Sequence, residues 1–391
     1  MKVREIKNEE KRRADELFAI AFEQPLPEEA EPDEGEHCWA AFTDEGKMMS
    51  DFIISDALMN FDGSAVKAGL IGAVATLPQY RRRGGIRACF EKALPDMYEK
   101  GYIFSCLYPF SSAYYRKFGY ESCARRLSAK VDLGLLRPES TEGSIRLAED
   151  GSVRKDIREL DGLWEHSFNT MIIHAEEDYG WTEKLRPAES LEFCYIYSDS
   201  TGKAKAYTVF RMENQPDGRN LVCSRFCFAD AGGFDGLMNL FKSLSADHRY
   251  VKFLLPADDA LMYLLPEWAM GAVSWAPAEA EMVRVINVPE VLKKARYRGS
   301  GRVILKINDA QIPENNKTFL TEFSDGSAVG AEETELSPDA EMDISAFSAL
   351  ITGSCGIDCA AGSFRSLRIY NKKAPLYSVF YKKRIMINEY F

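Results

Sequence analysis

An almost uninterrupted apolar run, Ala68–Leu77, is followed closely by the basic, glycine-rich segment YRRRGGIR and then by a stretch with helical periodicity. A run of this length and composition is typical of a strand that is covered on both faces of a sheet. The following segment, Arg83–Lys100, is amphipathic and is succeeded by Gly101, which predicts a helix with a glycine stop. The chain is therefore expected to contain a strand–turn–helix unit whose turn combines bare backbone with positive charge.

This turn has the properties of an anion site. The first turn of a helix presents unpaired backbone N–H groups and the positive end of the helix dipole. Gly84 and Gly85 have no Cβ, so a ligand can approach their backbone closely. Positive charge surrounds them, from Arg81, Arg82, Arg83 and Arg87. The combination suits a pyrophosphate, although an ordinary basic helix cap would use the same residues. The triphosphate loop GxxxxGK[ST] and the dinucleotide fingerprint GxGxxG are both absent from the sequence.

Strand and helix patterns surround this turn over residues 1–120 and predict a mixed α/β domain. The strand patterns are Cys38–Thr43, Asp51–Phe61, Ala68–Leu77 and Tyr102–Tyr108, and the helix patterns are Glu9–Phe22, Arg83–Lys100 and Ser111–Phe118. An acidic, proline-rich loop at Pro25–His37 is either plain solvated surface or the rim of a site for cations.

The rest of the chain repeats the alternation of strands and helices. A chain of 391 residues exceeds what one core usually organises, so two or three domains are expected. A composition shift at Leu135–Gly143, which indicates a linker, and a second change of pattern from Arg284 onward favour three domains, 1–140, 141–285 and 286–391. The second region contains no basic glycine turn. Its predicted helices are Val153–Ile173 and Gly233–Ala246, and its strands are Ala204–Arg211, Asn220–Ala229 and Tyr250–Leu255. The third region is predicted to contain strands Arg302–Asn308, Lys317–Ser324 and Pro375–Tyr381 and a helix Ile344–Thr352.

Composition narrows the function classes. The net charge of −11 argues against nucleic-acid binding and is compatible either with a cationic, amine-bearing partner or with solubility alone. The nine cysteines include no CxxC pair and the four histidines are dispersed, so no metal site is predicted. The N-terminus lacks the apolar core of a signal peptide, and no apolar run reaches the length of about 18 residues of a membrane span. We therefore expect a cytoplasmic protein that has no membrane partner.

A second motif follows the basic turn. In YPFSSAYYRKFGYE, a strand and a short helix lead into the run Tyr115–Tyr120, which fits YxxxG[FY]. The turn and this run, in this order, resemble the GNAT acetyltransferase superfamily. With the segment DISAFSALITG at Asp343–Gly353, nearly the whole chain resembles the enhanced-intracellular-survival family of N-acetyltransferases, most strongly over residues 69–120. The resemblance implies two GNAT-type domains, the second without the cofactor motif, then a sterol-carrier-like domain that ends in the active-site C-terminus. It also implies a homohexamer.

The resemblance further implies an acetyl-CoA site. The pantetheine arm would lie along the strand before the turn, and the pyrophosphate would lie over the turn itself. Phe110 and Ser111 fall where the family completes the pocket, although the family's Ser-Glu pair is not matched there. The cofactor residues so implied are Val74, Ala75, Thr76, Arg82, Arg83, Gly84, Gly85, Ile86, Arg87, Phe110 and Ser111.

Two catalytic groups are implied by the same resemblance. Tyr115 matches the family tyrosine that protonates the CoA thiolate, and a reference pKa near 10 keeps a phenol protonated at neutral pH. A buried core aromatic is the alternative, with Tyr114 and Tyr120 as neighbouring candidates. The family's base is the terminal carboxylate, here that of Phe391, which would need burial to raise its pKa from about 3.5. Glu389 is a secondary candidate that would attract a cationic substrate.

Together these features predict an acetyl-CoA-dependent N-acetyltransferase in which an amine attacks the thioester directly. The predicted acceptors are primary amines of a cationic small molecule, such as an aminoglycoside or a polyamine, or lysine side chains. A non-catalytic sensor of acyl-CoA or lipid is the alternative, and transfer of another acyl group, such as propionyl, is a third.

Overall fold

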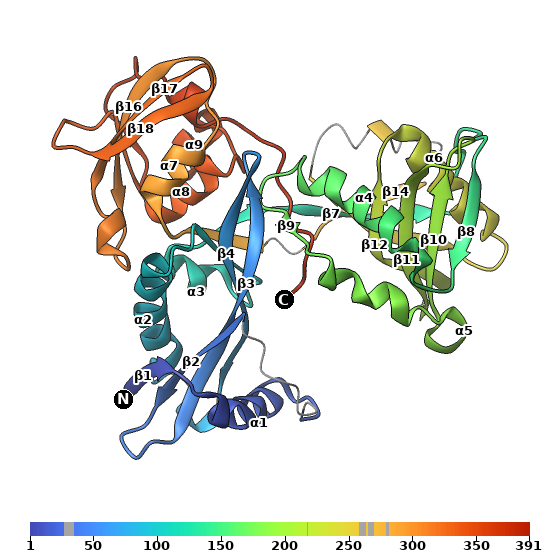
Figure 1. The fold of residues 1–391 in the computed structure, drawn as a ribbon, viewed down its shortest axis with the longest axis horizontal. Helices are drawn as coiled ribbons and strands as arrows, with labels where there is room; N and C mark the ends of the chain where they lie inside the picture. Colours follow the sequence, from blue (N-terminus) through green and yellow to red (C-terminus); the bar gives the residue numbers. More distant parts are fainter. Residues whose placement is uncertain (27–34, 217, 258–262, 265–269, 279–280) are drawn as a thin grey trace. The chain divides into compact units, whose positions relative to one another are not determined.

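The computed structural model describes residues 1–391 except 27–34, 217, 258–262, 265–269 and 279–280 (Figure 1). Most of the acidic loop predicted at Pro25–His37 lies outside the described residues. The chain forms two compact units. The first comprises Met1–Ala124, Glu281–Lys383 and Ile387–Phe391, and the second comprises Arg125–Ala280 and Arg384–Met386.

The first unit contains a sheet with the strand order β1-β2-β3-β4-β5-β15-β6. Its strands are β1 (Lys2–Glu5), β2 (Glu36–Phe42), β3 (Met48–Phe61), β4 (Ser64–Thr76), β5 (Phe104–Leu107), β6 (Glu121–Ala124) and β15 (Glu281–Val285). Successive buried residues of β2 pack in two different hydrophobic clusters. Trp39 packs in the cluster that contains residues of α2 (Gly85–Glu99), and Ala40 packs in the cluster that contains residues of α1 (Lys11–Phe22). Because successive side chains of a strand point to opposite faces, the two helices cover opposite faces of the sheet.

Two strands of this sheet separate and form a fork. β4 and β5 run parallel, and their pairing ends at Ile71 and Leu107. The register between β3 and β4 shifts at the same level, between Asp51 and Ile53, and Ala73 of β4 adopts a φ of 51°. A non-glycine residue in the left-handed region marks local strain, and a bulge bends its strand. Beyond Ile71 the backbone of β4 is therefore not paired with β5, and its polar groups on that edge can bind a ligand.

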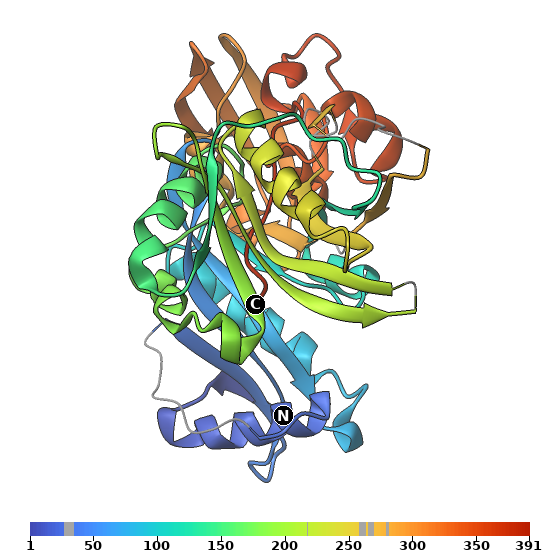
Figure 2. The ribbon, with the colours of Figure 1, turned by 90° about the vertical axis from the view of Figure 1, so that its right-hand side faces the viewer.

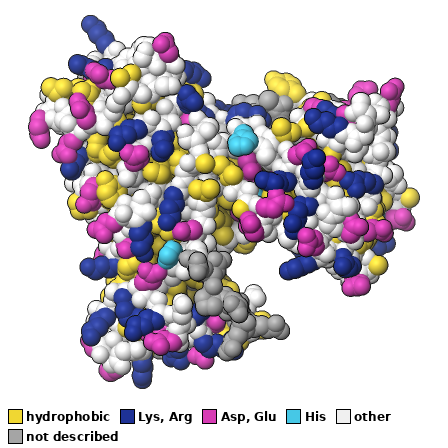
Figure 3. All heavy atoms as spheres, viewed as in Figure 1, with side chains coloured by type: hydrophobic (Ala, Val, Ile, Leu, Met, Phe, Trp, Pro, Cys, Tyr) yellow, Lys and Arg dark blue, Asp and Glu magenta, His cyan; other side chains and the backbone are white. Residues whose placement is uncertain are grey.

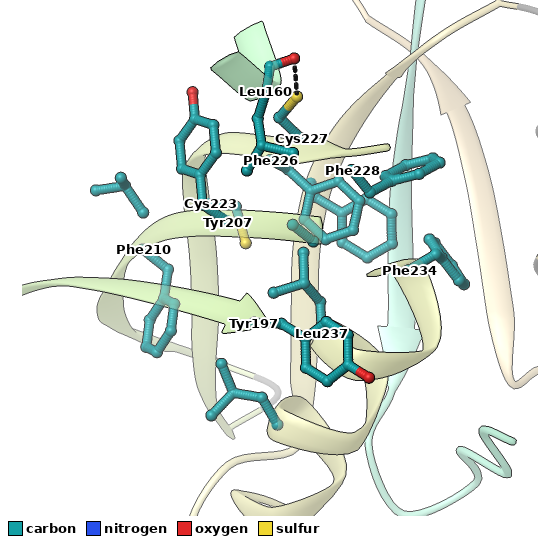
Figure 4. Packing of buried hydrophobic residues seen from close by; sticks show 14 of the residues in the cluster. Leu160, Tyr197, Tyr207, Phe210, Cys223, Phe226, Cys227, Phe228, Phe234 and Leu237 are labelled. Atoms are coloured by element: carbon teal, nitrogen blue, oxygen red, sulfur yellow. Dashed lines mark hydrogen bonds between the residues drawn. The ribbon is translucent and has the colours of Figure 1, made fainter. Parts of the chain in front are cut away.

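The second unit contains a separate sheet with the order β14-β7-β13-β12-β11-β10-β8. Its strands are β7 (Arg126–Asp132), β8 (Ser144–Ala148), β10 (Glu192–Ser198), β11 (Ala204–Gln215), β12 (Gly218–Phe228), β13 (Tyr250–Pro256) and β14 (Val273–Pro277). The helices are α4 (Arg154–Glu165), α5 (Pro187–Ser190) and α6 (Ala231–Ser243), and β9 (Ile172–Ile173) is a short strand. Figure 4 shows the core between β12 and α6, where Phe226 and Phe228 contact Phe234 edge-on.

The chain leaves the first sheet after β6 and returns in β15, and β7 belongs to the second sheet. Two segments differ from the sequence-based expectations. The helix predicted at Val153–Ile173 is too long: α4 ends at Glu165, and Thr170 has a φ of 67°, which an α-helix cannot contain. The strand predicted at Pro375–Tyr381 is wrong, because this segment holds the short helix α10 (Leu376–Val379).

A third sheet, in the first unit, has the order β18-β17-β16-β19-β20. Its strands are β16 (Gly301–Asn308), β17 (Thr318–Ser324), β18 (Ser327–Glu333), β19 (Ala340–Asp343) and β20 (Arg368–Ile369), with helices α7 (Val288–Lys294), α8 (Ile344–Ile351) and α9 (Ile357–Ser363). Within the described ranges, no helix combines the length and the apolar character needed to cross a bilayer. On the face drawn in Figure 3, basic and acidic side chains are interspersed.

Candidate active site

A cavity of about 1060 Å³ opens at the fork of the first sheet. Its described walls come from the end of α1, from β4 beyond Ile71, from the turn at residues 80–84, from the start of α2, and from α3 (Ser112–Tyr115). Tyr390 and Phe391 also line it. In Figures 1 and 2 the C-terminal segment runs back to the strands of the first sheet. All of these residues belong to the first unit.

The N-terminus of α2 is open towards this cavity. Its cap residue, Gly84, has a φ of 82°, and no side chain of a described residue caps the helix. Gly85, Ile86 and Arg87, which form the first turn, all line the cavity. Their N–H groups have no partner in the preceding turn of an α-helix, so they are available to an anion.

The lack of a side chain at Gly85 also allows α2 to pack closely against β3. A Cβ at this position would lie 2.4 Å from Ser50 Oγ on β3, and Ser50 Oγ is held by a hydrogen bond of 3.0 Å from Thr76 Oγ1. The helix therefore approaches the sheet as closely as it does only because Gly85 has no side chain.

Arginines surround the same turn. Arg81, Arg82, Arg83 and Arg87 all line the cavity, and their side chains are exposed. Arg82 has a φ of 64°, a strained conformation for a residue with a Cβ. The Arg83 guanidinium carbon lies 5.5 Å from the centre of the Tyr80 ring. Guanidinium groups and a helix N-terminus at one end of the cavity make that end attractive to a diphosphate.

Tyr115, on α3, also lines the cavity. The residue is only 1 % exposed, and its ring contacts Phe90, Phe110, Tyr114 and Tyr120. Burial, and to a smaller extent Tyr114, raises the pKa of its phenol above the ordinary value, so the proton stays on at neutral pH. In the described part of the chain its hydroxyl has no hydrogen-bond partner, whereas the hydroxyl of Tyr120 lies 2.7 Å from Ser105 Oγ. Of these two, Tyr115 is therefore free to donate to a ligand.

The C-terminal residues occupy the fork. A Cβ on Gly72 of β4 would lie 3.3 Å from the carboxyl carbon of Phe391. Tyr108, which follows β5, contacts the rings of Tyr390 and Phe391 at centroid distances of 4.5 and 5.2 Å. The main-chain carboxyl group of Phe391 is thus held where β4 and β5 separate.

The cavity brings together most residues that the sequence singled out. Phe110 lines it, and so do Val74, Ala75, Thr76, Arg82, Arg83, Gly84, Gly85, Ile86, Arg87, Tyr115 and Phe391. Ser111 and Glu389 are not among its described lining residues; Ser111 instead precedes α3, and its carbonyl accepts from Tyr114 N. Sequence reasoning missed Gly72, Ala73, Tyr108 and Tyr390. A glycine inside an apolar strand is a signal for a close approach, and it could have found Gly72.

No group of three His, Cys, Asp or Glu side chains among the described residues could hold a metal ion.

Three family models match the chain. A model described as an acetyltransferase (GNAT) domain matches residues 2–123, a second model with the same description matches residues 174–285, and a sterol carrier protein domain matches residues 288–362. The order of these matches agrees with the expected order of domain types.

Proteins of known sequence or structure give the same picture. An uncharacterized N-acetyltransferase from Streptomyces avermitilis is 23 % identical over 327 residues, which cover 78 % of this chain and 77 % of the relative. A probable N-acyltransferase from Enterococcus faecalis superposes with a TM-score of 0.86 at 20 % identity, covering 100 % of this chain and 99 % of that one. Eis1 from Mycobacterium abscessus superposes with a TM-score of 0.81 at 18 % identity, covering 100 % of both chains. At these identities the structural similarities establish the fold.

Proposed function

We propose that this chain, which belongs to the GNAT acetyltransferases and has the domain organisation of the enhanced-intracellular-survival family, transfers the acetyl group at the fork of its first sheet. GNAT acetyltransferases use acetyl-CoA as co-substrate. One observation carries the proposal: a single cavity joins the open N-terminus of α2, the free edge of β4, Tyr115 and the Phe391 carboxyl group.

The pyrophosphate of acetyl-CoA would bind the N–H groups of Gly85, Ile86 and Arg87 and the surrounding arginines. The pantetheine arm would run along Val74–Thr76, where β4 has parted from β5 and its backbone groups are not paired with that strand. This arrangement would hold the thioester close to Tyr115 and Phe391, and such positioning supplies a large part of the rate enhancement in bimolecular reactions.

The transfer would proceed in one step between the two substrates. The amine nitrogen attacks the acetyl carbonyl carbon, a C–N bond forms, and the C–S bond of the thioester breaks. The Phe391 carboxylate takes a proton from the amine, and the Tyr115 phenol gives a proton to the departing thiolate. The buried and protonated state of Tyr115 supports its role as the acid.

The acceptor would be a primary amine, either on a cationic small molecule of the aminoglycoside or polyamine type or on a lysine side chain. The net charge of −11 and the carboxyl group of Phe391 in the cavity support a positively charged acceptor.

Release of free thiol from acetyl-CoA tests the proposal, with polyamines, aminoglycosides and lysine peptides as acceptors. Turnover should be seen with at least one class, and a short extension after Phe391 should abolish turnover and leave the affinity for acetyl-CoA near normal. A matched extension before Met1 is the control. Tight binding of acetyl-CoA without any turnover would favour a sensor, and full activity of the C-terminally extended protein would exclude the Phe391 carboxylate as the base.

A further inference from the structure

Tyr108 is a cavity residue without a part in the chemistry proposed above. Tyr108 follows β5 directly, at the position where β4 and β5 part, and it lines the cavity. Its hydroxyl lies 2.6 Å from the main-chain carbonyl oxygen of Glu389 and 2.6 Å from Oε1 of Glu281. Glu281 is fully buried and begins β15, the strand that pairs with β5.

The position of Glu281 follows from the sheet. Because Met282 pairs with Leu107 in the antiparallel β5–β15 ladder, Glu281 is the next residue towards Tyr108. The carboxylate therefore stands beside the phenol on the neighbouring strand. A contact between a half-buried phenol and a fully buried carboxylate fixes the orientation of the ring, since alternative rotamers would leave the carboxylate without this donor.

The ring and the hydroxyl of Tyr108 hold the same segment. The ring contacts both C-terminal aromatic rings, and the hydroxyl reaches the carbonyl of the residue that precedes them. On the opposite side, the absent side chain of Gly72 leaves the space in which the Phe391 carboxyl group lies. The C-terminal residues are thus held between Tyr108 and the bulged part of β4.

We infer that Tyr108, oriented by Glu281, is the positioning residue that docks the C-terminal segment in the fork and so places the Phe391 carboxylate beside the bound thioester. The inference rests on the proposed function for its catalytic consequence, but docking itself can be measured without turnover. Chain ends are ordinarily mobile unless they are tied down. A base carried on the last residue is useful only if something holds it, and Tyr108 has the contacts to do so.

Two measurements on Tyr108→Phe test this role. Removing the hydroxyl leaves the ring contacts in place but removes the one O–H donor that lies between the Glu389 carbonyl and the Glu281 carboxylate. We expect kcat to fall about five- to tenfold, as for the loss of one hydrogen bond, with the KM for acetyl-CoA within about twofold of the unmodified protein. We also expect carboxypeptidase A to release Phe391 about five- to tenfold faster, as followed by mass spectrometry. Tyr377→Phe, at an exposed tyrosine on α10, is the matched control and should change neither value.

The outcomes separate the two hypotheses. Faster release of Phe391 with an unchanged kcat would retain the docking role of Tyr108 and reject the Phe391 carboxylate as the base. If Tyr108→Phe changes neither the rate of Phe391 release nor kcat, the inference is overturned. If Tyr108→Phe does not fold, Gly72→Ala crowds the carboxyl group from β4 while Tyr108 is kept. Carboxypeptidase A should also release Phe391 faster from this variant. Release at the rate of the unmodified protein would count against docking of the C-terminal segment in the fork.

Discussion

Each of the two GNAT domains contains a helix that follows a β-hairpin, but the N-termini of these two helices differ. In the first, the antiparallel hairpin β3–β4 is followed by α2 and then by β5, which is parallel to β4. In the second, the hairpin β11–β12 is followed by α6 and then by β13, which is parallel to β12. Residues 77–84 separate β4 from α2, but only residues 229–230 separate β12 from α6.

The two helix N-termini differ in charge as well as in the length of the segment that precedes the helix. The cap of α6 is Asp230, whose carboxylate accepts a hydrogen bond of 2.9 Å from Gly233 N and lies 2.8 Å from Lys205 Nζ. In α2 the corresponding cap is Gly84, which has no side-chain acceptor for the N–H groups of the first turn. A carboxylate that already occupies the helix N-terminus satisfies one of its donors and repels a phosphate. The same topology therefore provides an anion site in one domain and a self-capped helix in the other.

The largest expected effect concerns two buried tyrosines, one in each domain. Tyr115→Phe should lower kcat about 100-fold, because the thiolate would leave without its proton donor. Tyr207→Phe in the second domain should leave kcat near normal and lower stability, since it removes the hydrogen bond of 2.6 Å to buried Asp161. Steady-state kinetics and thermal unfolding distinguish the two variants. Equal kinetic losses in both would contradict the assignment of Tyr115.

The pH dependence follows from the same tyrosine. Because burial raises the pKa of Tyr115, its active, protonated form persists as the pH rises through the neutral range. The rate should therefore show no decline due to Tyr115 below about pH 10. A pH profile of kcat that falls between pH 7 and 9 for the unmodified protein, and not for Tyr115→Phe, would argue for a different environment of this phenol.

The substitution Gly84→Asp places at the N-cap of α2 the residue type that caps α6 in the second domain. The new carboxylate would accept from the first turn of α2 and repel the diphosphate, so we expect acetyl-CoA to bind about 30-fold more weakly. Gly84→Asn is the matched control for shape, because asparagine tolerates the left-handed backbone and adds no charge. Isothermal titration would contradict electrostatic exclusion if both variants bound equally well.

A smaller effect is expected for Gly85→Ala. The new Cβ would press on Ser50 Oγ and shift the start of α2 away from β3, weakening acetyl-CoA binding about tenfold. Ser50→Gly in the same chain should restore part of the affinity, because it removes both atoms of Ser50 that the Cβ would meet. Failure of this rescue would show that the close approach of helix and sheet is not what Gly85 provides.

The smallest effect on the cofactor is expected for Asp230→Ala. Loss of this cap should cost about 1 kcal/mol of stability and leave acetyl-CoA affinity unchanged. Thermal unfolding and titration measure the two quantities. A second equivalent of bound acetyl-CoA would show that Asp230 alone closes the second domain.

The fold was predictable where periodicity and turn chemistry agree. The apolar run of β4, the glycine that ends α2 and the YxxxG[FY] run predicted their elements and, through the resemblance, the order of domain types. Long-range pairing could not be read in this way. β15 joins the first sheet only after residues 125–280 of the second unit have intervened. The helix α10 replaces a predicted strand in a segment too short for periodicity to decide.

The site was predictable in its cofactor half, because glycines and arginines at the start of a helix that follows an apolar strand favour an anion site. The fork was not predictable. Nothing in the sequence shows that Ala73 adopts a positive φ or that β4 parts from β5 at Ile71. The contacts of Tyr108 with Glu281 and Glu389 join residues far apart in the chain, which no local pattern reveals.

Hydrogen–deuterium exchange with and without coenzyme A tests the contrast between the two helix N-termini most directly. We predict that the ligand protects the amides of Gly85, Ile86 and Arg87 in the first turn of α2 and leaves those of residues 231–233 in α6 unchanged. Protection of the α6 turn, or unchanged exchange at the α2 turn while the ligand is bound, would contradict the account.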